Sequence, residues 1–474
     1  MLVRSSVASG RALAPVAANA SASSATRQFA VLSDKYSPLF VKRKGEQVAS
    51  APIGRKTVSK TSQGVTVATY DDMGPVSTLA VVLGGGSRHN DAHHPGLAHI
   101  VKTSLIRNLP GDNIVRTIRE TELRGDTLST ELTRENIIVR SEFLRDDLVD
   151  AVPLLLKSVF NPHFYPYEFL DTMPKVVAET AASLTDPSTT VLENLHRVAF
   201  RTGLGNPLFA SEDSLHGMTR AHVAEFVGKY FSPERTAIVG VGISHADLIG
   251  LVEGILASVK LGGSQAAATI PATKYFGGEA AAEGGPHSEA HVAVAFPSVA
   301  FTSPDYPVSL VLRALLDSTP RTLYATASSG LLSPAITADT SVSAIHAAYS
   351  DAGLIGFYAK GASSDMKTVV QTGIQALASA AAGVSESALA RAKKVAIVEA
   401  EAALENKAEK VADLGRQVLS SIGGYHTSAD LADAISKVSA RDVAKLASTA
   451  VKAKPSMSSY GNLGLLPYLD EVKL

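Results

Sequence analysis

Hydrophobic and polar positions alternate along this chain in ways that predict strands in some stretches and helices in others. Residues 77–83 form an apolar-rich run that is typical of a strand. Residues 126–143 alternate in polarity on both sides of a polar turn and predict a pair of strands. Residues 384–415 form the most obvious helical stretch. The remaining strand-like runs are residues 236–241, 291–296, 342–349 and 354–359.

The same order of patterns occurs twice, about 220 residues apart. Thr219 and Ser439 each precede an amphipathic helix, where a hydroxyl is a favourable N-cap. The first helix leads into the strand-like run 236–241, and the second leads into a run that ends at residues 460–463. The chain therefore carries an internal duplication.

This duplication predicts an α+β fold made of two homologous α/β domains. Each domain is expected to be a mostly antiparallel sheet with helices packed on one face. We place the domains at residues 46–261 and 286–474. Residues 262–285 between them are rich in Gly and Ala, and their composition is typical of a linker.

The N-terminal segment, residues 1–30, differs from the rest of the chain. It is rich in Ser and Ala and contains no acidic residue, because the first one is Asp34. This composition is typical of a mitochondrial transit peptide. We predict a transit peptide at residues 1–29 with cleavage after Phe29, which makes Arg27 the third residue before the cut, the usual spacing; a disordered tail is the alternative. The arginines of the segment are Arg4, Arg11 and Arg27.

Composition narrows the classes of function. The 474 residues carry a formal net charge of −1 and no Lys- or Arg-rich block, so nothing favours a nucleic-acid partner. Cysteine is absent, which excludes disulfides and thiolate metal sites. No apolar run reaches the ~18 residues that a membrane-spanning helix needs. We expect a protein that is soluble or that associates with a membrane through its partners.

Residues 96–103, Gly-Leu-Ala-His-Ile-Val-Lys-Thr, are the most informative stretch for function. They follow the run 77–83 and a glycine-rich turn, and this layout resembles the pitrilysin-like metalloproteases. The zinc helix of that family reads H-x-x-E-H, with two histidines on one helical face and a glutamate as general base. Here the first histidine is His99, but Lys102 and Thr103 stand at the positions of the glutamate and the second histidine.

The resemblance implies a third zinc ligand about eighty residues downstream, where Glu179 stands. Only two of three ligands then remain, whereas a catalytic zinc needs three protein ligands and a water. An ammonium about 4 Å from a cation costs about 4 kcal/mol per unit charge at an effective dielectric near 20. We therefore predict no catalytic residue and no metal. The vestigial family positions are His99, Lys102, Thr103 and Glu179.

Further residues extend the resemblance to the core proteins of mitochondrial ubiquinol–cytochrome c reductase (complex III), core subunit 2 among them. The similarity covers residues 46–474. It implies a pitrilysin-like fold and a non-catalytic subunit with no cofactor, peripheral on the matrix side of the mitochondrial inner membrane. The implied partners are a core subunit 1-like protein and the cytochrome and small subunits of the complex. The residues concerned are 133–136, 193–196, 277–279, 347–358 and 461–463.

Two other functions stay open at this point. A non-catalytic alpha-type subunit of the mitochondrial processing peptidase would help to hold presequences, but residues 277–285 lack the long run of glycines that marks this subunit. An active metalloprotease in its own right would require Lys102 to be irrelevant. A separate group of histidines is a candidate for a metal site, but exposed loop histidines are common and no spacing fixes their geometry, so we expect no functional metal there. The histidines of this group are His89, His93, His94 and His99, around Asp91.

Overall fold

The computed structural model describes residues 56–107, 114–162, 164–258, 271–285, 288–319, 330–337, 339–420 and 427–471. The predicted transit peptide at residues 1–29, with its cleavage site at Phe29, lies outside these described residues.

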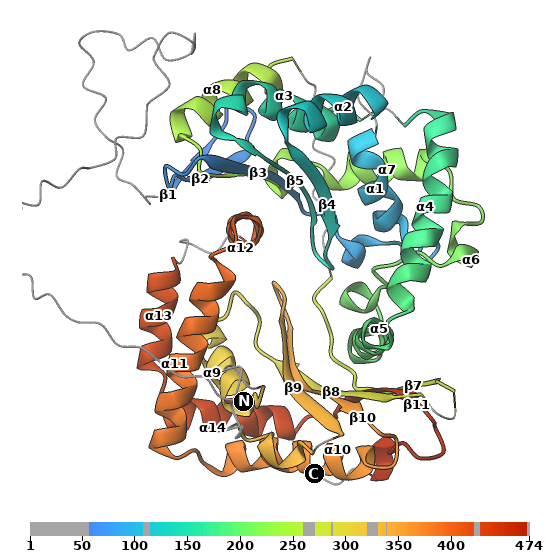
Figure 1. Cartoon of the computed structure of the whole chain (residues 1–474), viewed down its shortest axis with the longest axis vertical. Coiled ribbons are helices and arrows are strands. Elements are labelled where there is room, and N and C mark those ends of the chain that lie inside the picture. Colours follow the sequence, from blue (N-terminus) through green and yellow to red (C-terminus); the bar gives the residue numbers. More distant parts are fainter. Residues whose placement is uncertain are drawn as a thin grey trace, which may run out of the picture. The chain divides into compact units, whose positions relative to one another are not determined.

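The first half of the chain builds a mixed sheet with the strand order β1-β2-β6-β3-β5-β4 (Figure 1). Neighbouring strands are antiparallel, except that β2 and β6 run parallel. The strands are β1 (Lys56–Lys60), β2 (Thr66–Tyr70), β3 (Val76–Leu83), β4 (Thr127–Leu132), β5 (Ile137–Leu144) and β6 (Thr236–Val241). The helices are α1 (Leu97–Ser104), α2 (Ile114–Arg124), α3 (Leu148–Phe160), α4 (Pro166–Leu184), α5 (Pro187–Phe200), α6 (Glu212–Leu215), α7 (Arg220–Tyr230) and α8 (His245–Leu256).

The second half repeats this arrangement with the strand order β7-β11-β8-β10-β9, in which only β7 and β11 are parallel. The strands are β7 (Gly278–Glu283), β8 (Ala290–Ser298), β9 (Thr340–Ala348), β10 (Gly353–Gly361) and β11 (Ser456–Gly461). The helices are α9 (Tyr306–Leu316), α10 (Met366–Ala382), α11 (Glu386–Ala403), α12 (Lys407–Leu419), α13 (Ser428–Lys437) and α14 (Ala440–Val451).

Each sheet packs its own helices on one face, which confirms the predicted fold class. In the first half, apolar residues of α1, α3, α7 and α8 form one core with the sheet. In the second half, α9, α10, α11 and α14 do the same. Thr219 and Ser439 are the N-caps of α7 and α14, as the sequence predicted. The hydroxyl of Ser439 accepts a hydrogen bond from the Asp442 amide at 3.3 Å, which satisfies an otherwise unpaired donor.

The opposite face of each sheet is covered by one helix from the other half of the chain (Figure 1). Val411 and Leu414 of α12 pack on the first sheet, against residues that include Ala80 and Val82. Leu195 of α5 packs on the second sheet, against small residues such as Ala293. α5 and α12 hold equivalent positions in the duplication, so each half of the chain contributes one helix that covers the sheet of the other half.

Two expectations need correction. Residues 278–283 of the predicted linker form strand β7, because their backbone continues the ladder of β11. The second sheet therefore begins before residue 286. The helical stretch at residues 384–415 is divided between α11 and α12, since Asn406 starts a new helix and its side chain accepts from the Ala408 amide at 2.9 Å.

Candidate functional site

Helix α1 carries the degenerate zinc motif and is placed by a glycine at its start. Gly96 is the N-cap and has a φ of 87°, in the left-handed region that favours glycine. A Cβ at this position would lie 2.4 Å from the Cβ of Ala210. This close approach brings the segment before α6 against α1. The backbone amide of Ala210 then donates to Nδ1 of His99 at 3.3 Å.

That backbone contact fixes which nitrogen of His99 carries the proton. Because Nδ1 accepts from Ala210, the neutral ring holds its hydrogen on Nε2. Nε2 lies 2.9 Å from Oε2 of Glu179 on α4 and donates to it. The imidazole is buried, with 2 % of its side chain exposed. Burial lowers the pKa of His99, although the hydrogen bond to Glu179 raises it in part.

Lys102 occupies the space beside this pair. Its Nζ donates to Oε2 of Glu179 at 2.8 Å, and its side chain is 17 % exposed. Burial raises the pKa of Glu179, but the hydrogen bonds from Lys102 and His99 outweigh it and hold that pKa below its usual value. Glu179 is therefore a carboxylate whose charge is already matched by an ammonium group.

Thr103 does not take part in this cluster. Its hydroxyl donates to the backbone carbonyl of His99 at 2.9 Å, a bond within its own helix. The structure thus brings His99, Lys102 and Glu179 together and leaves Thr103 aside. The zinc that the family resemblance implies does not fit these residues. One ligand position is occupied by Thr103, and the carboxylate of Glu179 is paired with the ammonium group of Lys102. Among the described residues, no three His, Asp or Glu side chains form a group that could hold a metal.

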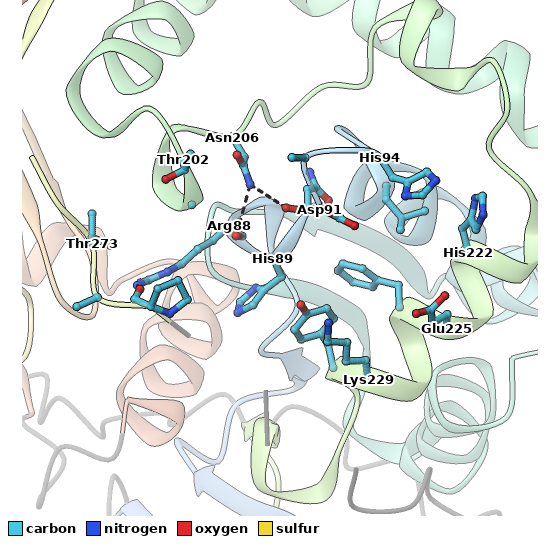
Figure 2. A pocket seen from close by; sticks show the side chains of 18 of the residues that line it. Arg88, His89, Asp91, His94, Thr202, Asn206, His222, Glu225, Lys229 and Thr273 are labelled. Carbon is cyan, nitrogen blue, oxygen red and sulfur yellow. Dashed lines mark hydrogen bonds between the residues drawn. The ribbon is translucent and has the colours of Figure 1, made fainter. Parts of the chain in front are cut away.

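The histidines around Asp91 do not converge on a common metal position either, because the side chains of His89, His94 and His99 have separate partners. Nε2 of His89 lies 2.7 Å from the guanidinium of Arg235, and burial lowers the pKa of His89 to about 3. The ring of His94 instead packs against His222, with 4.1 Å between centroids. Figure 2 shows His94 and His222 beside each other and away from His89, around a cavity of about 680 Å³. His99 points toward Glu179, as described above.

A buried ion cluster joins the two halves close to this cavity. Arg88, from the 3₁₀ turn Ser87–His89, donates to Glu135 at 2.9 Å and to Oδ1 of Asp351 at 2.9 Å. The backbone amide of Ser350 donates to Glu135 at 3.0 Å. Arg88 and Asp351 are 263 residues apart in the sequence. Burial raises the pKa of Asp351, but hydrogen bonds from Arg88 and Thr273 lower it further than burial raises it.

A second set of contacts lies next to this cluster. Arg134 pairs with Glu193 of α5 and donates to the backbone carbonyl of Asn206 at 2.9 Å. Nδ1 of His196 lies 2.7 Å from the Leu192 carbonyl and must donate to it. Nε2 of the neutral ring therefore accepts from the hydroxyl of Tyr349 at 2.8 Å. Burial lowers the pKa of His196 to about 3 and raises that of Tyr349 to about 12.

These contacts explain residues that the sequence singled out without a role. Residues 133–136, 193–196 and 347–358 carried the resemblance to core proteins, and they meet at one seam between the two halves. Sequence reasoning missed Arg88, which binds across this seam. Its only signal was a lone arginine after a glycine turn, which has no pattern that indicates a distant partner.

Comparison with known proteins agrees with this geometry. Residues 65–212 match the family model described as "Insulinase (Peptidase family M16)". Residues 217–395 match the model described as "Peptidase M16 inactive domain". The chain belongs to the M16 peptidase family. This family is the one that the degenerate motif of α1 resembles, so the predicted recognition is confirmed.

Individual relatives of this M16 protein are similar over most of their length. A relative from Cryptococcus neoformans var. grubii, "Cytochrome b-c1 complex subunit 2, mitochondrial", is 32 % identical over 90 % of this chain and 97 % of its own. The "Mitochondrial-processing peptidase subunit alpha" of Solanum tuberosum is 24 % identical over 88 % of this chain and 84 % of its own. A chain in the structure "Complex III2 from Candida albicans, Inz-5 bound" has the same fold, with a TM-score of 0.76, 19 % identity and coverage of 88 % of this chain and 98 % of that one.

Proposed function

We propose that this M16 protein is a non-catalytic core subunit of mitochondrial complex III, of the subunit 2 type. It supports assembly and stability of the complex in respiratory electron transport. The observation that carries the proposal is the ammonium group of Lys102 at 2.8 Å from Glu179, where the family places metal chemistry. The relative named as subunit 2 of the cytochrome b-c1 complex supports the choice of complex.

The fold suits a protein whose task is to provide binding surfaces for the other subunits of a complex. Its buried polar residues at the seam hold one half of the chain to the other. We infer a permanent interface with a core subunit 1-like protein, and interfaces of this kind bury more than about 2,000 Å². We place the chain on the matrix side of the inner membrane. Within the described residues, no helix has the length and apolar character needed to cross a bilayer.

The second candidate is an alpha-type subunit of the mitochondrial processing peptidase. The relative from Solanum tuberosum supports it. Against it stands the structure of residues 277–285, where a glycine-rich loop would be needed. Residues 278–283 are instead committed to strand β7 by their ladder with β11. We therefore rank this function second.

Purification of the tagged protein from mitochondrial membranes in mild detergent separates the two functions. We expect it to co-migrate with b- and c-type haem absorbance in a large membrane complex. A Lys102→Ala variant should assemble in the same way, because the proposal gives Lys102 no catalytic task. A haem-free soluble heterodimer that cleaves presequences would contradict the complex III function and support the processing-peptidase function.

A further inference from the structure

One edge of the second sheet lacks a strand that the first sheet has. The orders β2-β6-β3-β5-β4 and β7-β11-β8-β10-β9 correspond strand by strand, with one parallel pair at the same place in each. In the first sheet, β1 then pairs antiparallel with β2 along its whole length. Among the described residues, no strand pairs with the corresponding side of β7. β7 is therefore an edge strand where its equivalent is covered.

The backbone of β7 presents alternate groups to that open side. The amides of Gly278 and Gly284 donate to the carbonyls of Pro455 and Gly461, at 3.1 and 2.8 Å. Because the bonding residues of a strand alternate in a parallel ladder, the amide and carbonyl groups of residues 279, 281 and 283 point away from β11. These three residues are Glu279, Ala281 and Glu283, and all are exposed.

The duplication also indicates what chemistry fits this edge. Thr66 and Tyr70 of β2 pair with Ala237 and Val241 of β6. At the offset of about 220 residues, the equivalents of those β6 residues in β11 are Met457 and Gly461, and their partners are Glu279 and Glu283. Glu279 and Glu283 therefore hold the places of Thr66 and Tyr70.

In the first sheet, the residues opposite Thr66 and Tyr70 are Lys60 and Lys56 of β1. A strand placed on β7 as β1 is placed on β2 would set basic residues, four positions apart, opposite Glu279 and Glu283. The Glu279 carboxylate accepts from the Leu469 amide at 3.0 Å. Within the described residues, neither glutamate forms an ion pair with Lys or Arg. Cross-strand pairs of opposite charge stabilise a sheet, whereas like charges destabilise it.

We propose that the open edge of β7 binds an extended basic segment of a partner protein, which adds to the second sheet as an antiparallel strand with Lys or Arg four positions apart. Main-chain hydrogen bonds to residues 279, 281 and 283 supply the binding, and the two glutamates select the basic sequence. A second copy of this chain is disfavoured at the same edge, because two β7 strands would bring glutamates together.

The test uses the full chain and a fluorescent peptide with the sequence of residues 54–62, Gly-Arg-Lys-Thr-Val-Ser-Lys-Thr-Ser. The decisive variant is Ala281→Pro, which removes an outward amide hydrogen but no bond to β11. Ala281→Val is the matched control. We expect saturable binding to the wild type and to Ala281→Val, and at least about tenfold weaker binding to Ala281→Pro. The thermal midpoint of Ala281→Pro should stay close to that of Ala281→Val, and the bound peptide should slow hydrogen exchange of the Glu279, Ala281 and Glu283 amides.

Charge reversal tests whether Glu279 and Glu283 select a basic sequence. Glu279→Lys with Glu283→Lys should lose the basic peptide and bind a peptide in which both lysines are glutamates. Absence of saturable binding to the wild type would overturn the proposal. Equal binding by Ala281→Pro and Ala281→Val would also overturn it, because attraction between charges alone would then explain the result.

Discussion

The ammonium group of Lys102 lies 2.8 Å from the carboxylate of Glu179, so an internal ion pair stands where the H-x-x-E-H motif of the family has its glutamate. His99 keeps the geometry of a ligand, since its Nδ1 accepts from the Ala210 amide and its Nε2 faces Glu179. Two residues within one helical turn, Lys102 and Thr103, thus separate this helix from the H-x-x-E-H motif.

A metal site should return when both positions are restored. We expect the double variant Lys102→Glu with Thr103→His to bind one zinc ion per chain, because two histidines at i and i+4 would then stand beside Glu179. Zinc retained after gel filtration, measured by atomic absorption, checks this. Wild type should retain none, and adding His99→Ala should abolish the binding. A double variant that binds no zinc would show that the helix has moved from the position a ligand set requires.

The ion cluster at the seam should dominate the attachment of the two halves. Arg88→Ala leaves Glu135 and Asp351 in a largely buried place without their cation, so we expect a loss of about 3 kcal/mol in the free energy of unfolding. Arg116→Ala breaks an exposed pair with Glu120 and should cost under about 1 kcal/mol. Urea denaturation of both variants measures the difference. Similar losses would contradict a dominant role of the Arg88 cluster in the seam.

The contact of α12 with the first sheet should depend on one glycine. A Cβ at Gly415 would lie 2.4 Å from a methyl group of Val82, so Gly415→Ala should destabilise the chain by about 1–3 kcal/mol. Gly250→Ala in α8 is the control, because a Cβ there would meet no atom from outside its own helix within 4 Å, and alanine favours helices by about 1 kcal/mol. Thermal unfolding should therefore shift in opposite directions. A stabilising Gly415→Ala would show that α12 can move away from β3.

Acid should weaken the seam through His196. Its pKa is lowered to about 3 in the folded chain, whereas an unfolded histidine titrates near 6.5. The unfolded state therefore binds a proton first, so stability is complete above about pH 6.5 and falls as the pH drops toward 3. His196→Gln should make this fall shallower by about 1 kcal/mol per pH unit. Urea titrations at several pH values test it, with His93→Gln on the exposed His93 as the control. An unchanged slope in His196→Gln would contradict the assignment.

Local patterns in the sequence determined several of the strands and helix starts. Alternation and apolar runs act between neighbours in the chain, so β3, β5, β6 and β10 formed where the sequence predicted them. Thr219 and Ser439 cap helices through bonds to their own next turn. The departure from the zinc motif was also legible, because Lys102 and Thr103 stand within one helical turn of His99.

Only the tertiary structure decided the parts that depend on distant neighbours. Composition suggested a linker at residues 262–285, but β11 provides a ladder for residues 278–283 and turns weak strand formers into β7. The exchange of α5 and α12, and the contact of Arg88 with Asp351, join residues far apart in the chain. No periodicity records such pairs, because their stability comes from burial and charge matching that exist only once both halves have folded together.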